Sequence, residues 1–184
     1  NLSNRNLVVN GSCIVAQRAA SASATRGMKT VDRFAEEHSG LDANPDQAQV
    51  AVSASDAPYE KGLTKAFKLT NGNQTSGARV GDYIRILYSI EAQDIRNSGW
   101  DYTDTNSYIT ISFWVRSSVA YTSGVTLKTD DGTAQLYRHP FALSANTWTK
   151  VTKAIPGNSS LTINDDNGLG LQIAFQCFYG TNYT

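Results

Sequence analysis

The stretch that decides the fold is residues 108–118, which read Tyr-Ile-Thr-Ile-Ser-Phe-Trp-Val-Arg-Ser-Ser. Its apolar residues fall on alternate positions, at Ile109, Ile111, Phe113 and Val115. Because a β-strand sends successive side chains to opposite faces, this stretch predicts one apolar face and one mostly polar face. Its β-branched and aromatic residues suit a half-buried pleated surface. We therefore predict a central strand of an antiparallel sandwich, with Trp114 as the exception on the polar face.

Other short strand-like segments follow one another along the chain, separated by Gly, Pro, Asn and Asp. We predict strands at residues 13–17, 49–53, 66–70, 83–91, 125–129, 134–143, 148–155, 161–163 and 169–179. Asp130-Asp131-Gly132 predicts a hairpin, and Pro140 predicts an edge or a bulge in the strand that contains it. Residues 92–99 have the spacing of a short helical turn. We interpret residues 18–30 and 38–46 as loops.

This pattern gives about eight to ten short strands, without sustained helical periodicity and without an internal repeat. Such a series predicts an all-β sandwich or barrel. A chain of 184 residues fits one domain and can bury a hydrophobic core large enough to fold without disulfides or metals. We expect a lead-in at residues 1–5 and a single domain over residues 6–184. Since the first residue is Asn, we also expect a fragment or a processed chain.

The charges balance, with 16 Lys and Arg against 16 Asp and Glu. Nucleic acids and anionic membranes both attract excess positive charge, so we expect neither as a partner. No apolar run is long enough to span a bilayer, so we expect no membrane insertion. A net charge near zero gives little electrostatic protection against self-association.

Cys13 and Cys177 are the only cysteines. They could form a disulfide if the first and last strands were neighbours, but free buried thiols are the favoured interpretation. The sequence has no Cys/His spacing typical of zinc sites. The acidic turn at residues 165–168 could offer oxygen ligands to calcium, yet it lacks the twelve-residue ligand pattern. We predict no metal and no cofactor.

The sequence offers no convincing catalytic constellation. His38 and His139 are the only histidines, and neither lies beside a Gly-x-Ser-x-Gly turn or another nucleophile motif. Paired carboxylates can cleave glycosides, and the chain has Asp130-Asp131 and Asp165-Asp166. Both pairs fall in turn sequences, where Asp is favoured because its side chain bonds the local backbone. We therefore predict that the protein is not an enzyme.

Aromatic residues give the better candidate site. Trp100 and Tyr102 lie two positions apart in a predicted polar loop, so in extended backbone both rings would point the same way. Such a platform could stack on a pyranose ring, while nearby polar groups bind the hydroxyls. The candidate ligand-binding residues are Trp100, Asp101, Tyr102, Asp104, Asn106 and Trp114. The alternative is that these aromatic residues belong to the core or to an interface, with Trp100 folded inward as a plug.

Eight segments, taken in order, carry a resemblance to a known family. They are residues 6–11, 17–18, 31–34, 89–91, 111–117, 146–148, 155–157 and 167–171. The ordered set resembles phage tail-fibre and virion structural domains, and it covers nearly the whole chain. Cys13 and Phe34 depart from the family, which commonly has an aromatic and a Trp at these places. The family pattern also continues past a segment like residues 180–184 into one more strand. The resemblance therefore implies either that the closing strand is absent or that the domain continues beyond Thr184.

The resemblance implies a jelly-roll β-sandwich, like those of carbohydrate-binding modules, on a virion appendage. We expect a tail fibre or receptor-binding component that binds a host-surface glycan or docks to other virion proteins. The family also implies a homo-oligomer, with a trimer favoured. One alternative is a purely structural capsid decoration or fibre module without a ligand. Another is a secreted carbohydrate-binding module of a glycoside hydrolase.

Overall fold

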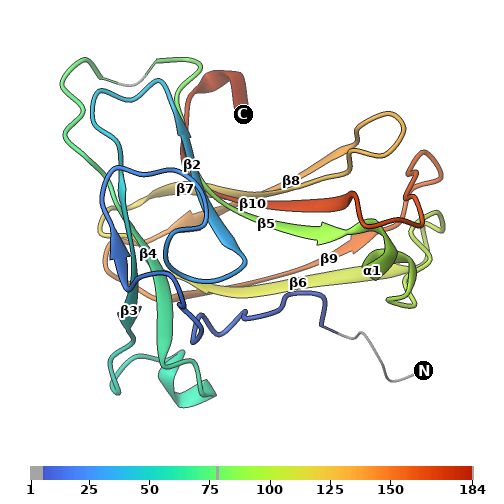
Figure 1. The fold of residues 1–184 in the computed structure, drawn as a ribbon, viewed down its shortest axis with the longest axis horizontal. Coiled ribbons are helices and arrows are strands. Elements are labelled where there is room, and N and C mark those ends of the chain that lie inside the picture. Colours follow the sequence, from blue (N-terminus) through green and yellow to red (C-terminus); the bar gives the residue numbers. More distant parts are fainter. Residues whose placement is uncertain (1–5, 78, 184) are drawn as a thin grey trace. The chain divides into compact units, whose positions relative to one another are not determined.

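The computed structural model describes residues 6–77 and 79–183, and these are mostly β-structure (Figure 1). The one α-helix in the described residues is short, and two single-turn 3₁₀ helices accompany it. No described helix is long and apolar enough to cross a membrane. The ten strands and the α-helix are β1 (Ser21–Ala22), β2 (Phe34–Ser39), β3 (Asp46–Ala51), β4 (Lys65–Thr70), β5 (Tyr83–Glu91), α1 (Ala92–Arg96), β6 (Tyr108–Val115), β7 (Tyr121–Lys128), β8 (Leu136–Leu143), β9 (Thr149–Pro156) and β10 (Leu169–Tyr179).

Hydrogen bonds group the strands into three sheets with the orders β1-β3-β4, β2-β5-β10-β7-β8 and β6-β9. Each strand pair with a defined register is antiparallel. The all-β prediction is therefore confirmed, and the described residues form ten strands where about eight to ten were predicted. The chain divides into two compact units, a first unit of residues 1–9 and 89–173 and a second unit of residues 10–88 and 174–184. The single domain stays a prediction.

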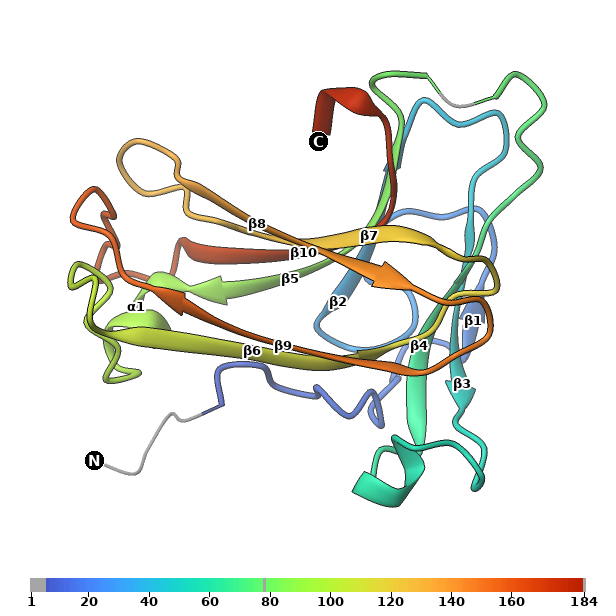
Figure 2. The same cartoon turned by 180° about the vertical axis from the view of Figure 1, so that it is seen from behind.

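In the first unit, β6 and β9 run side by side (Figure 2). The predicted alternation along β6 is confirmed, since Thr110 and Ser112 are exposed while Ile111 and Phe113 are partly buried. Phe113 meets Phe141 of β8 edge-on, with ring centroids 5.7 Å apart, so the β6-β9 sheet packs against the β7-β8 hairpin. The prediction of a central strand is wrong, because β6 pairs with β9 alone in a two-stranded sheet of the described chain.

For the strand that contains Pro140, the sequence predicts an edge or a bulge. Pro140 belongs to β8, which ends the order of the five-stranded sheet, and it faces Gly124 of β7. A proline has no N–H to donate to a neighbouring strand, so an edge strand tolerates it. The predicted edge is confirmed.

In the second unit, β2 pairs with β5, and Phe34 lies opposite Tyr88. The ring of Phe34 also contacts Phe67 of β4, with ring centroids 6.4 Å apart, and the ring of Tyr88, at 5.0 Å. The β1-β3-β4 sheet therefore packs against the β2-β5 pair around these three aromatic rings.

Several local expectations are wrong, among them the loop at residues 38–46, whose ends belong to β2 and β3. Residues 13–17 form no strand, because Asn10 folds this segment back on itself and its side chain bonds both the amide and the carbonyl of Val15. Residues 161–163 form no strand either, although Ile163 is buried. The predicted loop at residues 18–30 contains the two-residue strand β1. Cys13 and Cys177 are both free thiols.

Candidate functional site

The predicted binding loop, residues 97–107, joins α1 to β6 and is held in tight turns by its own side chains. Oδ1 of Asp101 accepts hydrogen bonds from the amide of Thr103 at 3.1 Å and from its hydroxyl at 2.8 Å. Oδ1 of Asp104 accepts in the same way from the amide of Asn106 at 2.8 Å. Such Asx turns fix the backbone locally. The side-chain hydrogen bond from Thr103 is the main reason why the pKa of Asp101 lies below its ordinary value.

The loop also rests on the turn that follows β9. The amide of Gly157 donates to the carbonyl of Ser107 at 2.9 Å, and the amide of Asn158 donates to the carbonyl of Tyr102 at 2.8 Å. A Cβ at residue 157 would lie 2.7 Å from the Tyr102 carbonyl oxygen and 2.5 Å from that of Asp104. Glycine at this position therefore allows the loop backbone to approach closely.

Trp100 and Tyr102 are half-buried neighbours in this loop. Their ring centroids are 6.3 Å apart and their planes meet at 68°, so the rings form a corner rather than one flat platform. Nε1 of Trp100 donates to the carbonyl of Ser107 at 3.3 Å, and the hydroxyl of Tyr102 accepts from Nη1 of Arg96 at 3.2 Å. The corner arises because the backbone turns at Tyr102 instead of remaining extended.

The polar candidates of the loop remain open to solvent. Asp101, Asp104 and Asn106 are all exposed. Oδ1 of each aspartate is engaged within the loop, whereas Oδ2 of each has no hydrogen-bond partner among the described residues. The loop therefore presents two carboxylate oxygens that can accept hydrogen bonds from a ligand.

Trp114 lies apart from this loop. It is six residues beyond Tyr108 along β6, which corresponds to roughly 20 Å in a strand. It is half-buried and lies opposite Lys150 of β9. The structure thus brings five of the six candidate residues together and leaves Trp114 on another part of the unit.

The acidic pairs lie in turns, where Asp130 and Asp166 make local contacts and Asp131 contacts a distant loop. Asp130 forms an ion pair with Lys128, and Asp131 accepts two hydrogen bonds from Asn164, at 2.9 and 2.8 Å. Asp166 accepts from the amide of Gly168 at 2.9 Å. In the described residues, no three His, Cys, Asp or Glu side chains gather as a metal site would require.

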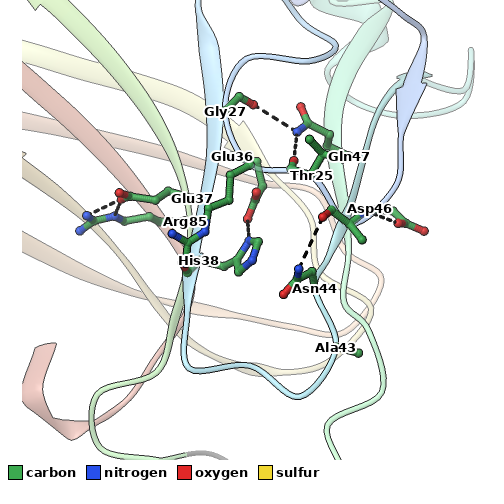
Figure 3. A network of polar contacts seen from close by, with 12 residues as sticks. Thr25, Gly27, Glu36, Glu37, His38, Ala43, Asn44, Asp46, Gln47 and Arg85 are labelled. Atoms are coloured by element: carbon green, nitrogen blue, oxygen red, sulfur yellow. Dashed lines mark hydrogen bonds and ion pairs between the residues drawn. The ribbon is translucent and has the colours of Figure 1, made fainter.

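Glu36 and His38 form a buried polar pair in the second unit that the sequence did not predict. His38, expected in a loop, belongs to β2 and is only 4% exposed, while Glu36 is 1% exposed. Figure 3 shows both side chains on the same side of β2, whereas Glu37 points the other way and pairs with Arg85. The signal was present in the sequence, because residues 34, 36 and 38 share one face of a strand and Phe34 marks that face as buried.

The two side chains of this pair are in direct contact. Nδ1 of His38 lies 2.8 Å from Oε1 of Glu36. Oε2 of Glu36 is buried and has no hydrogen-bond partner among the described residues. Burial raises the pKa of Glu36, and the hydrogen bond with His38 only partly opposes this.

His38 also forms part of the wall of a surface hollow of about 630 Å³ in the second unit. We call it the arginine hollow. Its lining residues are Ala24, Thr25, Arg26, His38, Gly40, Leu41, Asn44 and Arg79. The lining includes two guanidinium groups and one imidazole but no acidic residue.

The sequence matches no protein-family model, and a search of curated proteins finds no relative of the chain.

Proposed function

We propose that this chain is a jelly-roll β-sandwich domain of a phage virion appendage, a tail fibre or receptor-binding component that binds a host-surface glycan. The resemblance of the ordered sequence segments to tail-fibre domains supports the virion location. The packing within each unit supports the jelly roll, since strands of different sheets face each other through Phe113 and Phe141 in the first unit and through Phe34 and Phe67 in the second.

The observation that carries glycan binding is the corner formed by Trp100 and Tyr102. An aromatic ring can stack on the apolar face of a pyranose, and the open carboxylate oxygens of Asp101 and Asp104 can accept hydrogen bonds from its hydroxyls. The polar edges of both rings are already bonded to the protein. Because the loop is ordered before the ligand arrives, binding would lose little conformational entropy in immobilising the loop.

The test is binding of the full-length protein to a glycan array and to host cells. Trp100→Ala and Tyr102→Ala should each weaken binding by about tenfold or more, since each removes a stacking surface. Tyr59→Ala is the matched control, because Tyr59 is an exposed tyrosine in the second unit. If the loop variants bind a glycan as well as the wild type does, this loop is not the site. If no glycan and no host cell is bound, the purely structural alternative replaces this proposal.

Self-assembly belongs to the same proposal, with a trimer favoured and other virion proteins as further partners. The chain is neutral overall, and several large apolar side chains are exposed, among them Ile14, Val119 and Leu136. Association would cover such side chains, and closed symmetry is the usual result of self-association. Light scattering of the full-length protein at micromolar concentration should give a trimer, and a monomer would contradict this part of the proposal.

Catalysis is not part of the proposed function. We expect no turnover of polysaccharides, because Asp131 is hydrogen-bonded to Asn164 of another loop and Asp166 to the amide of Gly168 in its own turn. Hydrolysis that disappears in Asp131→Asn or Asp166→Asn would contradict this expectation and would favour a glycoside hydrolase.

A further inference from the structure

The arginine hollow brings together three loop segments of the second unit. Residues 24–26 precede β2, residues 40–44 connect β2 to β3, and Arg79 lies just before β5. Loops carried on a rigid sheet are common places for binding residues. The volume of about 630 Å³ lies within the range of sites for small molecules.

The walls of the hollow are tied together by hydrogen bonds. Asp42 accepts from the amide of Ser76 at 2.6 Å and from its hydroxyl at 2.7 Å, and the Gln74 side chain donates to the carbonyl of Ala43 at 2.7 Å. On the other side, the amide of Ala24 donates to Asp46 at 3.0 Å. These bonds hold the segments in place without a ligand, which lowers the entropy lost on binding.

The charge of the lining favours an anion. Arg26 donates to the carbonyl of His38 through Nη2, and Arg79 uses its own Nη2 for Ser76, at 3.2 Å, and for Asp42, at 3.8 Å. A guanidinium carries five N–H donors, so both arginines keep donors that no other described residue occupies. Asp42 offsets part of the charge of Arg79. Arg26 forms no ion pair in the described chain, and its electrostatic interaction with the buried Glu36 is longer-ranged.

His38 adds a third polar group, and Glu36 fixes its orientation. Because Nδ1 of His38 contacts Glu36, Nε2 is the ring nitrogen that remains without a partner in the described residues. Figure 3 shows the ring of His38 on the side of β2 that faces Asn44. Both residues line the hollow, together with the apolar side chains of Leu41 and Ala24.

We propose that the arginine hollow binds a small organic oxyanion, with an acidic sugar as the best-fitting class. Arg26 and Arg79 would hold its carboxylate or sulfate group, because guanidinium groups form strong charge-assisted hydrogen bonds with oxyanions. Asn44 and Nε2 of His38 would bind neighbouring hydroxyls, and Leu41 would contact the apolar part of the ring. This proposal concerns the second unit and does not depend on glycan binding by the Trp100 loop.

Calorimetric titration of the whole chain with three probes tests the proposal. Sodium glucuronate should bind saturably, whereas glucose, the neutral counterpart, should bind at least about tenfold more weakly or not at all. Competition with sodium sulfate shows which part of glucuronate the hollow recognises. Competition by sulfate indicates that the oxyanion group alone is recognised, and binding of glucuronate without such competition indicates that the sugar hydroxyls are required. Binding of neither anion in the millimolar range would overturn the proposal, as would equal binding of glucose.

Two variants and one control locate the site. Arg26→Gln and Arg79→Gln should each weaken anion binding by about tenfold or more, because each removes a charged donor. Arg116→Gln removes the same charge from an exposed residue outside the hollow and should bind like the wild type. Unchanged affinity in both hollow variants would overturn the proposal.

A measurement on the wild type covers the case in which these variants fail to fold. Titration with glucuronate or sulfate, followed by NMR, should shift the amide resonances of residues 24–26, 38–44 and 79. Shifts confined to other parts of the chain would place the anion elsewhere and refute the assignment to this hollow.

Discussion

Oε1 of Glu36 lies 2.8 Å from Nδ1 of His38, and both side chains are buried on the same side of β2. A buried charge is unfavourable unless it is paired and hydrogen-bonded. Here one carboxylate oxygen is bonded, and the other has no partner in the described residues. The pair is therefore only half satisfied, and the pKa of Glu36 is raised mainly by burial.

The first prediction concerns the pH dependence of stability. A carboxyl group with a raised pKa binds more protons in the folded chain than in the unfolded chain, whose value is near 4.5. Its contribution to the free energy of unfolding therefore falls as pH rises from about 4 towards 7. Glu36→Gln cannot ionise, so its stability relative to the wild type should increase over this range, by about 1.4 kcal/mol for each unit of pKa shift.

Urea denaturation at several pH values measures this difference. Glu60→Gln, in an exposed 3₁₀ helix, controls for the loss of one negative charge. Parallel pH profiles for the wild type and Glu36→Gln would contradict the prediction.

The second prediction uses two glycines of the second unit that both have positive φ. A Cβ at Gly40 would lie 2.8 Å from Cγ of Asp82, which is buried and accepts a hydrogen bond from the amide of Arg79. A Cβ at Gly62 would meet no atom within 4 Å. Gly62→Ala should therefore cost only the backbone strain of about 1–2 kcal/mol, and Gly40→Ala about 3 kcal/mol or more. Chemical denaturation measures both losses in the free energy of unfolding. Equal losses would contradict the prediction, because they would show that the Asp82 side chain moves aside at little cost.

The third prediction concerns the reactivity of Cys177. Burial, with a smaller contribution from the charge of Glu36, raises the pKa of its thiol to about 12. The thiolate is the reactive form, so its population is about a thousandfold lower than at the ordinary value of 9.0. In Cys13→Ser protein, alkylation by iodoacetamide should be at least about a hundredfold slower in the native state than in urea. Equal rates would contradict the raised pKa.

The fourth prediction separates the two interpretations of Trp100. Its side chain is half-buried, so Trp100→Ala should lower the free energy of unfolding by about 2 kcal/mol, roughly half the value for a fully buried tryptophan. Thermal and chemical denaturation measure this loss. A cost of about 4 kcal/mol or more, with host attachment intact, would identify Trp100 as a core residue rather than a binding residue.

Strands with regular alternation and clear turn residues could be predicted from the sequence. The strand expected at residues 83–91 coincides with β5, and the strand expected at residues 169–179 coincides with β10. The pairing of strands could not be predicted in the same way, because it depends on contacts between distant residues. The alternation of β6 was therefore recognised, while its place in a two-stranded sheet was not.

For the candidate sites too, local patterns could be predicted and contacts between distant residues could not. The sequence indicated the Trp100 loop because its aromatic and acidic residues are close together in the chain. The angle between the rings depends on Asx turns, which an extended-strand interpretation does not include. The arginine hollow combines residues as distant as Arg26 and Arg79, and no local pattern connects them. Gly40 follows His38 so closely that the sequence favours a loop at His38, although β2 extends to Ser39.

The position of β10 has a consequence for synthesis on the ribosome. In the five-stranded sheet it lies between β5 and β7, yet it follows both of them in the sequence. Until β10 emerges, β5 and β7 each expose an edge with unpaired N–H and C=O groups. Such edges readily pair with other chains. Nascent chains that are crowded on one messenger RNA therefore risk exchanging this strand, and fast translation of residues 92–179 would shorten the period of risk.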